Sequence, residues 1–121
     1  MTVKVRGVRG AVRVSQNNAE EILNATHELV IKIMTDNEIS TEDIAGAFFT
    51  TTDDLNAAFP AQAARSIGFQ FVPMLCSSEI NVPESMSRVI RVMLLVNTEK
   101  KQEEIKHIYL GETKRLRPDL E

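Results

Sequence analysis

Hydrophobic and polar residues alternate along some segments of the chain and recur at helical spacing along others. Residues 3–14 open with an alternation of valine with lysine or arginine, which predicts a β-strand, and the glycines within this segment predict a bulge or a close backbone approach. Apolar residues at positions 22–34 follow helical spacing. Asn18 precedes this stripe as an N-cap, and Glu21 stands where a capping box places an acid. The pattern predicts a strand followed by a helix that ends at positions 36–37.

Shorter apolar runs in the middle of the chain predict three further elements. Residues 45–51 are apolar enough for a buried strand. Pro60 is suited to the first position of a second helix, and Gly68 is suited to the position just past its end. Residues 69–76 predict a strand, which Pro73 confines to a sheet edge or a bulge.

The last third of the chain carries the strongest strand signal. Residues 88–98 are apolar on both faces, which is typical of a central strand. A charged turn or short helix is expected over residues 100–106, and a last strand over residues 107–110. The order β, α, β, α, β, β, β predicts an α+β (mixed α/β) fold, with a mixed sheet and the helices packed on one side of it. We expect a single domain over residues 1–121.

Charged residues are nearly balanced in number but unevenly placed. The chain has 121 residues, with 14 Lys and Arg against 17 Asp and Glu, and a net charge of −3. Basic residues gather near both ends, whereas acids dominate positions 20–54. A mildly acidic protein whose arginines gather at a few places favours a small anionic ligand over a polyanion. We therefore expect no nucleic-acid partner.

Cysteine content and the length of the apolar runs bear on the cellular compartment. The single cysteine, Cys76, allows no internal disulfide framework and favours a reducing environment. The apolar run at residues 92–96 is far too short to cross a bilayer, and no signal peptide is visible. We expect a cytoplasmic protein with no membrane partner.

Arg91 is the most informative single residue, because it lies within the most apolar segment of the chain, residues 89–96. A guanidinium does not lose its proton, so it must meet an anion, water or an acidic side chain there. The alternative, an arginine that points from a sheet edge into water, stays open at this level. Arg9 has the same two interpretations, with greater weight on exposure.

Other chemistry-bearing residues are isolated in the sequence. Cys76 stands in apolar company, which favours a small core residue over a reactive thiol, and Glu79 is consistent with a solvated acid at the end of a strand. His27 and His107 have no ligand at metal-binding spacing, and no phosphate-binding glycine loop is present. These residues favour an anion-binding pocket, or an enzyme that acts by positioning and electrostatics without a cofactor.

Several short motifs, in register over nearly the whole chain, carry a resemblance to a known family. They are VRGVRGA at 5–11, DL at 54–55, AFPA at 58–61, AR at 64–65, VP at 72–73, IRVM at 90–93, HIYL at 107–110 and LRPDL at 116–120. In these segments the chain resembles the small, trimeric, monofunctional chorismate mutases, the type with a mixed α/β, barrel-like trimer.

The resemblance implies a set of substrate-binding residues, of which Arg9, Glu79 and Arg91 would be the catalytic ones. Arg9 matches an arginine that grips a substrate carboxylate, and Arg91 one that reaches a carboxylate and the ether oxygen of the breaking bond. Glu79 and Cys76 match the pair that faces the ring hydroxyl, and Tyr109 matches a tyrosine that contacts the side-chain carboxylate. The implied opposite wall is Phe59, Ala61, Arg65, Met74 and Leu75, and the implied C-terminal lid is Leu116 and Arg117.

The same resemblance implies an assembly and a reaction. The fold would be a pseudo-α/β-barrel homotrimer, with each site shared by two neighbouring subunits. The substrate would be the dianion chorismate, which rearranges to prephenate by a pericyclic shift in aromatic amino acid biosynthesis, with no metal, cofactor or covalent intermediate. This agrees with the shortage of nucleophiles and metal ligands in the sequence.

Three alternatives remain at the level of the sequence. The first is a trimer of the same fold that binds small carboxylates without catalysis. The second is a trimer resembling the imine deaminases, whose signature motifs are not evident. The third is an RNA-binding module that uses Arg6, Arg9 and Arg13.

Overall fold

The computed structural model describes residues 2–117 of the chain, and Pro118, Asp119 and Leu120 of the C-terminal motif lie outside the described residues. Its five strands are β1 (Lys4–Arg13), β2 (Ile44–Thr51), β3 (Met74–Ser78), β4 (Val89–Thr98) and β5 (Ile108–Tyr109). Its helices are α1 (Ala19–Asn37), α2 (Ala61–Ile67) and the 3₁₀ turns η1 (Thr41–Asp43), η2 (Gln102–Glu104) and η3 (Gly111–Leu116).

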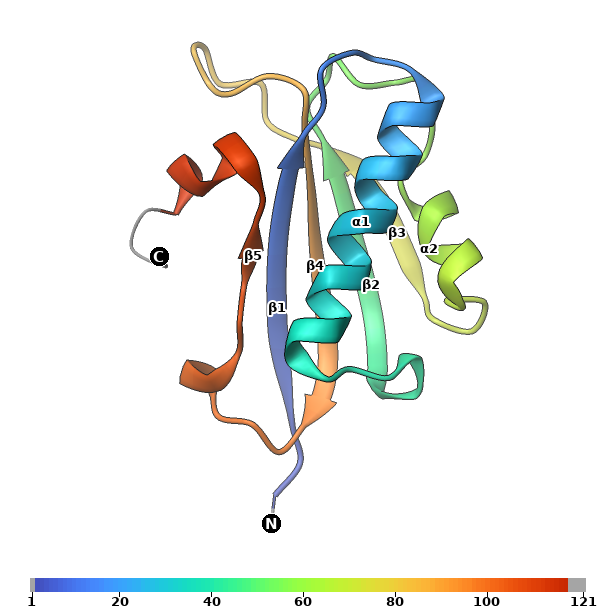
Figure 1. Cartoon of the computed structure of the whole chain (residues 1–121), viewed down its shortest axis with the longest axis vertical. Helices are drawn as coiled ribbons and strands as arrows, with labels where there is room; N and C mark the ends of the chain where they lie inside the picture. Colours follow the sequence, from blue (N-terminus) through green and yellow to red (C-terminus); the bar gives the residue numbers. More distant parts are fainter. Residues whose placement is uncertain (1, 118–121) are drawn as a thin grey trace.

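The strands form one mixed sheet in the order β3-β2-β4-β1-β5, with β4 in the centre as predicted. β4 pairs antiparallel with both β1 and β2, whereas β3 and β5 run parallel to their neighbours at the two edges. Both α-helices cover the same side of the sheet, with α1 crossing in front of β1, β4 and β2 (Figure 1). The predicted α+β domain with its helices on one side is confirmed.

The two faces of the sheet differ in what covers them. Alternate residues of β4, such as Val92 and Leu94, are buried in the core beneath the helices. Their neighbours point to the other side, where Met93 is 37% exposed, and its cross-strand partner Phe48 is 40% exposed. We call this second side the open face; its residues include Val5, Gly7, Arg9, Ala11, Phe48, Thr50, Leu75, Arg91, Met93 and Tyr109.

Helix α1 begins at the predicted N-cap, but its first turn differs from a standard capping box. The Asn18 side chain accepts a hydrogen bond from the Glu21 backbone N–H at 2.8 Å, as predicted. The Glu21 carboxylate reaches back to the Ser15 hydroxyl at 2.6 Å and to the Ser15 N–H at 3.0 Å. These bonds lower the pKa of Glu21. The box therefore joins the helix to the end of β1.

The predicted strand at residues 69–76 is wrong in its first half. Phe69 is fully buried, and its N–H donates to the Ala64 carbonyl at the end of α2, so the chain turns beneath this helix. β3 begins only after Pro73, as an edge strand, and α2 begins one residue later than predicted, with Pro60 as its N-cap. The strand prediction failed because the buried ring of Phe69 anchors a turn. A hydrophobic pattern alone does not distinguish such a residue from one in a buried strand.

The close backbone approach predicted for the glycines of β1 occurs at Gly10. A Cβ atom there would lie 2.8 Å from the Ile108 carbonyl oxygen and 2.8 Å from Cδ1 of Ile33. Gly7 makes no bulge, because β1 pairs with β4 without interruption. The absence of a side chain at position 10 therefore lets β5 and α1 both pack against β1.

No helix within residues 2–117 combines the length and apolar character needed to cross a bilayer.

Candidate active site

Two arginines and a glutamate meet in a cavity on the open face. The cavity measures about 310 Å³, and Arg9 of β1, Arg91 of β4 and Glu79, just after β3, line it. Its remaining lining residues are Phe48, Thr50, Val92 and Met93. We call this cavity the Arg91 cleft. Residues far apart in the sequence are thus joined by the strand order into one charged site.

Arg91 is held in the middle of the sheet with part of its guanidinium unpaired. It pairs across the strands with Thr50 of β2 and Ala11 of β1, so its side chain is flanked on both sides. Its Nη1 lies 3.5 Å from Oε1 of Glu79, and its side chain is 33% exposed. Its Nε is buried and has no hydrogen-bond partner among the described residues. A buried donor without an acceptor is costly, which favours a ligand that supplies one.

Glu79 is fixed by β2 through both its backbone and its side chain. Its N–H donates to the Thr51 carbonyl at 2.8 Å, which continues the parallel pairing of β3 with β2. Its Oε2 accepts a hydrogen bond from the Thr50 hydroxyl. The carboxylate therefore faces Arg91 in a set orientation, and is not the freely solvated acid that the sequence allowed.

Tyr109 lies on the same side of the sheet but does not line the Arg91 cleft. Ala11 pairs with Arg91 on one side and with Tyr109 on the other, so the three residues form one row across β4, β1 and β5. The Tyr109 ring packs against Ala11 and Val89, with Leu116 beside them. Its hydroxyl is buried without a hydrogen-bond partner within residues 2–117. After Nε of Arg91, the Tyr109 hydroxyl is the second buried polar atom on the open face without a hydrogen-bond partner among the described residues.

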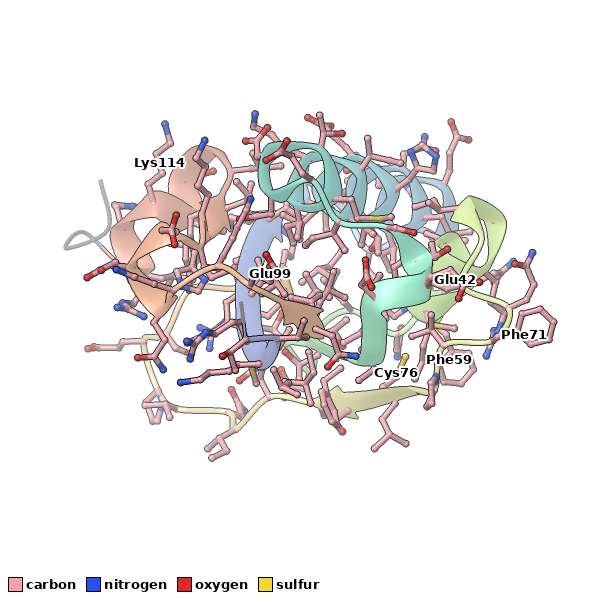
Figure 2. All side chains as sticks on the ribbon, turned by 90° about the horizontal axis from the view of Figure 1, so that it is seen from below. Glu42, Phe59, Phe71, Cys76, Glu99 and Lys114 are labelled. Carbon is pink, nitrogen blue, oxygen red and sulfur yellow. The ribbon has the colours of Figure 1, made fainter. Side chains whose placement is uncertain are left out.

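The other expected site residues lie elsewhere in the chain. Phe59 and Cys76 line a second cavity of about 680 Å³ between the start of α1, the 55–60 loop and β3. Figure 2 labels both residues in the half of the molecule that carries α2 and β3. Cys76 is exposed, which corrects the interpretation of a core residue, and it is not in the cleft with Glu79. The remaining expected residues are on α2 (Ala61, Arg65), on β3 (Met74, Leu75) and at the end of η3 (Leu116, Arg117). A single chain therefore does not gather the whole expected set in one cavity.

Sequence reasoning missed the residues that complete the Arg91 cleft. Thr50 orients Glu79, and Phe48 and Met93 supply its apolar wall. The signal was present, because Phe48 and Thr50 alternate with the core residue Phe49, and Met93 lies two residues after Arg91. Within the described residues, no group of three or more histidine, cysteine or acidic side chains is arranged to hold a metal ion.

Comparisons with known proteins show the family to which the chain belongs. A family model for chorismate mutase type I matches residues 5–120. The chain is 51% identical to chorismate mutase AroH of Thermus thermophilus over 118 residues, which is 97% of each chain. It is 42% identical to chorismate mutase AroH of Bacillus subtilis (strain 168) over 117 residues, 96% of this chain and 92% of that one.

A solved structure shares the fold as well as the sequence. A chorismate mutase from Clostridium thermocellum superposes with a TM-score of 0.89 at 44% sequence identity, covering 90% of this chain and 97% of that chain. The match in sequence extends over nearly the full length, and the match in structure covers 90% of the chain. The chain therefore belongs to the chorismate mutase type I family.

Proposed function

We propose that the Arg91 cleft is the place where this chorismate mutase, an isomerase, converts chorismate to prephenate. One observation carries the assignment of the site: the buried Nε of Arg91 is unpaired within residues 2–117, and its guanidinium lies beside a carboxylate that is held in place. Chorismate has two carboxylates, an ether oxygen and a ring hydroxyl. Its acceptor oxygens and its hydroxyl donor therefore suit a site with two arginines and one glutamate.

The rearrangement makes few demands on protein chemistry. The bond between the ring and the ether oxygen breaks while a carbon–carbon bond forms within the same molecule, and no proton is transferred. Catalysis then depends on holding the compact conformer, in which the reacting carbons face each other. Arg9 and Arg91 bind carboxylates in this proposal, and the buried Tyr109 hydroxyl supplies a further hydrogen bond.

Electrostatic stabilisation is the second part of the proposed mechanism. Negative charge grows on the ether oxygen as the bond breaks, and the Arg91 guanidinium is the fixed cation that meets it. Glu79 accepts a hydrogen bond from the ring hydroxyl, and its charge complements the ring, which becomes partly positive. The Thr50 hydroxyl keeps Glu79 in the required orientation before substrate arrives, so little reorganisation is needed.

We further propose that each site is completed by a second copy of the chain, in a homotrimer. The open face supports this, because Phe48, Met93 and Val5 expose large apolar side chains around a charged cleft. In this assembly the wall formed by Phe59, Arg65 and Leu75 comes from the neighbouring copy, and Leu116 and Arg117 close over the substrate. Residues 1–121 act as one domain, and the location is cytoplasmic.

Loss of chorismate absorbance on addition of purified protein tests the function. A non-catalytic carboxylate binder would bind chorismate and leave its absorbance unchanged, which would refute the proposal. The comparisons favour neither this alternative nor an imine deaminase. Sedimentation of the purified protein tests the assembly separately, and a monomer at micromolar concentration would refute the shared site.

Turnover is expected to depend little on pH. Because no step needs a group that gains or loses a proton, kcat should stay constant within about twofold between about pH 6 and 9. Steady-state kinetics with saturating chorismate at each pH measures this. A bell-shaped profile across that range would require a titrating acid and base, and would contradict the pericyclic mechanism.

Replacement of Cys76 by serine is expected to be mild. The thiol lines the second cavity and not the Arg91 cleft, and serine keeps a small polar side chain at that position. We expect kcat/KM to fall by less than about fivefold, in line with the loss of one weak contact. Ser77→Ala, next to it on β3, is the matched control. A loss of turnover in Cys76→Ser alone would show that the thiol takes part in the reaction.

A further inference from the structure

The short edge strand β5 begins one residue past the level of Arg9, so the backbone of Arg9 has no strand partner on this side within the described part of the chain. β5 has two residues, and these pair in parallel with Gly10 and Ala11 of β1. The Leu110 N–H donates to the Ala11 carbonyl at 3.0 Å, which sets the register of the ladder. In a parallel ladder the same pattern recurs every two residues, so the Arg9 N–H would next bond the Lys106 carbonyl.

Lys106 is held by helix α1 instead. Its carbonyl accepts a hydrogen bond from Nδ2 of Asn37 at 2.8 Å, and its N–H donates to Oδ1 of Asn37 at 2.7 Å. Asn37 is buried at the end of α1, and its Nδ2 also donates to the Ile33 carbonyl at 2.9 Å. The ladder is thus interrupted at the residue whose side chain enters the Arg91 cleft, and its backbone donor needs another acceptor.

The side chain of His107 supplies that acceptor. The Arg9 N–H donates to Nδ1 of His107 at 3.0 Å. A ring nitrogen accepts a hydrogen bond only when it carries no proton, so the neutral ring holds its proton on Nε2. The imidazole therefore takes the place of a backbone carbonyl and extends the ladder by one bond.

The surroundings of His107 keep its ring neutral. Arg6 lines a cavity of about 210 Å³ with it, together with Gly7, Gln102 and Ile105, and no carboxylate of the described chain is among these lining residues. Burial lowers the pKa of His107 below its usual 6.5, and the positive charges of Arg117 and Arg9 lower it further. Near neutral pH the ring is therefore in the form that accepts the Arg9 N–H.

We propose that His107 is a positioning residue, whose neutral imidazole fixes the backbone of β1 at Arg9 and so aims the Arg9 guanidinium into the cleft. This inference rests on the proposed function, in which Arg9 binds a substrate carboxylate. His107 itself touches no substrate. Because Arg9 binds the carboxylate both before and during the reaction, loss of its position should weaken binding more than it slows turnover.

Two substitutions at position 107 separate the acceptor from the bulk of the ring. His107→Ala removes the acceptor, and we expect KM to rise about five- to tenfold with kcat changed by less than about twofold, the scale of one lost hydrogen bond. His107→Asn places an amide oxygen near the position of Nδ1, and should restore KM to within about twofold of the original value. The control is His27→Asn, because His27 is exposed on α1. An unchanged KM in His107→Ala, or an asparagine variant as poor as alanine, would overturn the proposal.

A double-mutant cycle shows whether His107 acts through Arg9. In a protein that already carries Arg9→Ala, the further change His107→Ala should raise KM by less than about twofold, because the side chain that it positions is gone. A histidine with a general stabilising role would raise KM by the same factor in both backgrounds. Equal factors would therefore refute a positioning role.

The pH dependence of KM gives a third readout with a defined sign. Because the pKa of His107 is lowered in the folded protein, the ring gains its proton only at a pH below about 6.5. That proton occupies Nδ1, so the bond to Arg9 is lost and KM should rise at acidic pH, whereas His107→Asn should stay flat. A purely electrostatic role would lower KM for a dianion on protonation, and that result would contradict the proposal.

Protonation of His107 at acidic pH also lowers the stability of the folded protein, and this effect must be separated from the rise in KM. The unfolded chain binds this proton more readily than the folded chain, so the free energy of unfolding falls as the pH drops through about 6.5. Kinetics are therefore measured well below the melting temperature at each pH.

Nuclear magnetic resonance tests the hydrogen bond without any substrate. Long-range ¹⁵N–¹H spectra of His107 should show a proton on Nε2, and the Arg9 amide nitrogen should show a coupling to Nδ1. A ring protonated on Nδ1 at neutral pH would refute the inference even if the variants failed to fold. Absence of chorismate turnover in the unaltered protein would refute the proposed function alone, and leave this spectroscopic result valid.

Discussion

Replacement of Arg91 by alanine is expected to lower kcat/KM by at least about 10²–10³-fold, the usual cost of one preorganised donor to a developing negative charge. Its guanidinium lies in the cleft on the central strand, with Nε buried and unpaired and Nη1 near Glu79. Removal leaves growing charge on the ether oxygen without a cation, and leaves Glu79 without its partner. Most of the loss should appear in kcat, because the contact strengthens as the bond breaks.

Arg91→Lys should also lose most activity, although the charge is kept. A lysine has one compact ammonium group, and it does not reproduce the planar fork that reaches two acceptors at once. Steady-state kinetics of both variants, with melting temperatures to show that they are folded, tests the claim. Lys32→Ala on the outer surface of α1 is a control that removes a positive charge far from the cleft. A loss below about tenfold in Arg91→Ala would remove Arg91 from the mechanism.

The elements that sequence patterns predicted well are those with a strong period and clear ends. Residues 3–14 open with an alternation of valine and basic residues and contain β1, and the run of valine, methionine and leucine around Arg91 lies in the central strand β4. α1 begins after Asn18 because this side chain caps it. These features depend on neighbours in the sequence, so the sequence alone specifies them.

The elements that were missed depend on contacts between distant residues. Phe69 looked like a strand residue, but its burial beneath α2 makes a turn. The 3₁₀ turn η3 was not predicted; the Thr113 hydroxyl, which donates to the Ala11 carbonyl at 3.0 Å, ties it to β1. β5 has only two residues, because Asn37 of α1 holds the backbone of Lys106. No local pattern contains these partners.

The candidate site divides in the same way. Arg91 could be singled out because a guanidinium within an apolar strand needs an anion, and the structure places Glu79 beside it. That pairing required the strand order β3-β2-β4, which joins segments by tertiary pairing. The roles of Phe59, Arg65 and Leu75 came only from family resemblance. One chain leaves them outside the Arg91 cleft, so their role depends on an assembly that the sequence pattern does not contain.

A mixture of two inactive variants is expected to regain activity if each site takes its halves from two copies of the chain. Arg91→Ala damages the half that contains the cleft, and Arg65→Ala damages the proposed opposite wall on α2. In mixed trimers formed by co-expression or joint refolding in equal amounts, some sites combine the intact half of each variant. Each half is intact with even odds, so about a quarter of the unaltered activity should return.

A second pair of variants provides the control for this experiment. Arg91→Ala mixed with Glu79→Gln damages the same half in every copy, because both residues line the one cleft. No arrangement of these chains yields an intact site, so this mixture should stay as inactive as its components. Recovery in the first mixture alone would demonstrate a site shared between neighbours. The first mixture could instead stay inactive while its trimers form normally. In that case the cleft half with Arg91 and the wall half with Arg65 do not meet across an interface, and the cleft would have to act within a single chain.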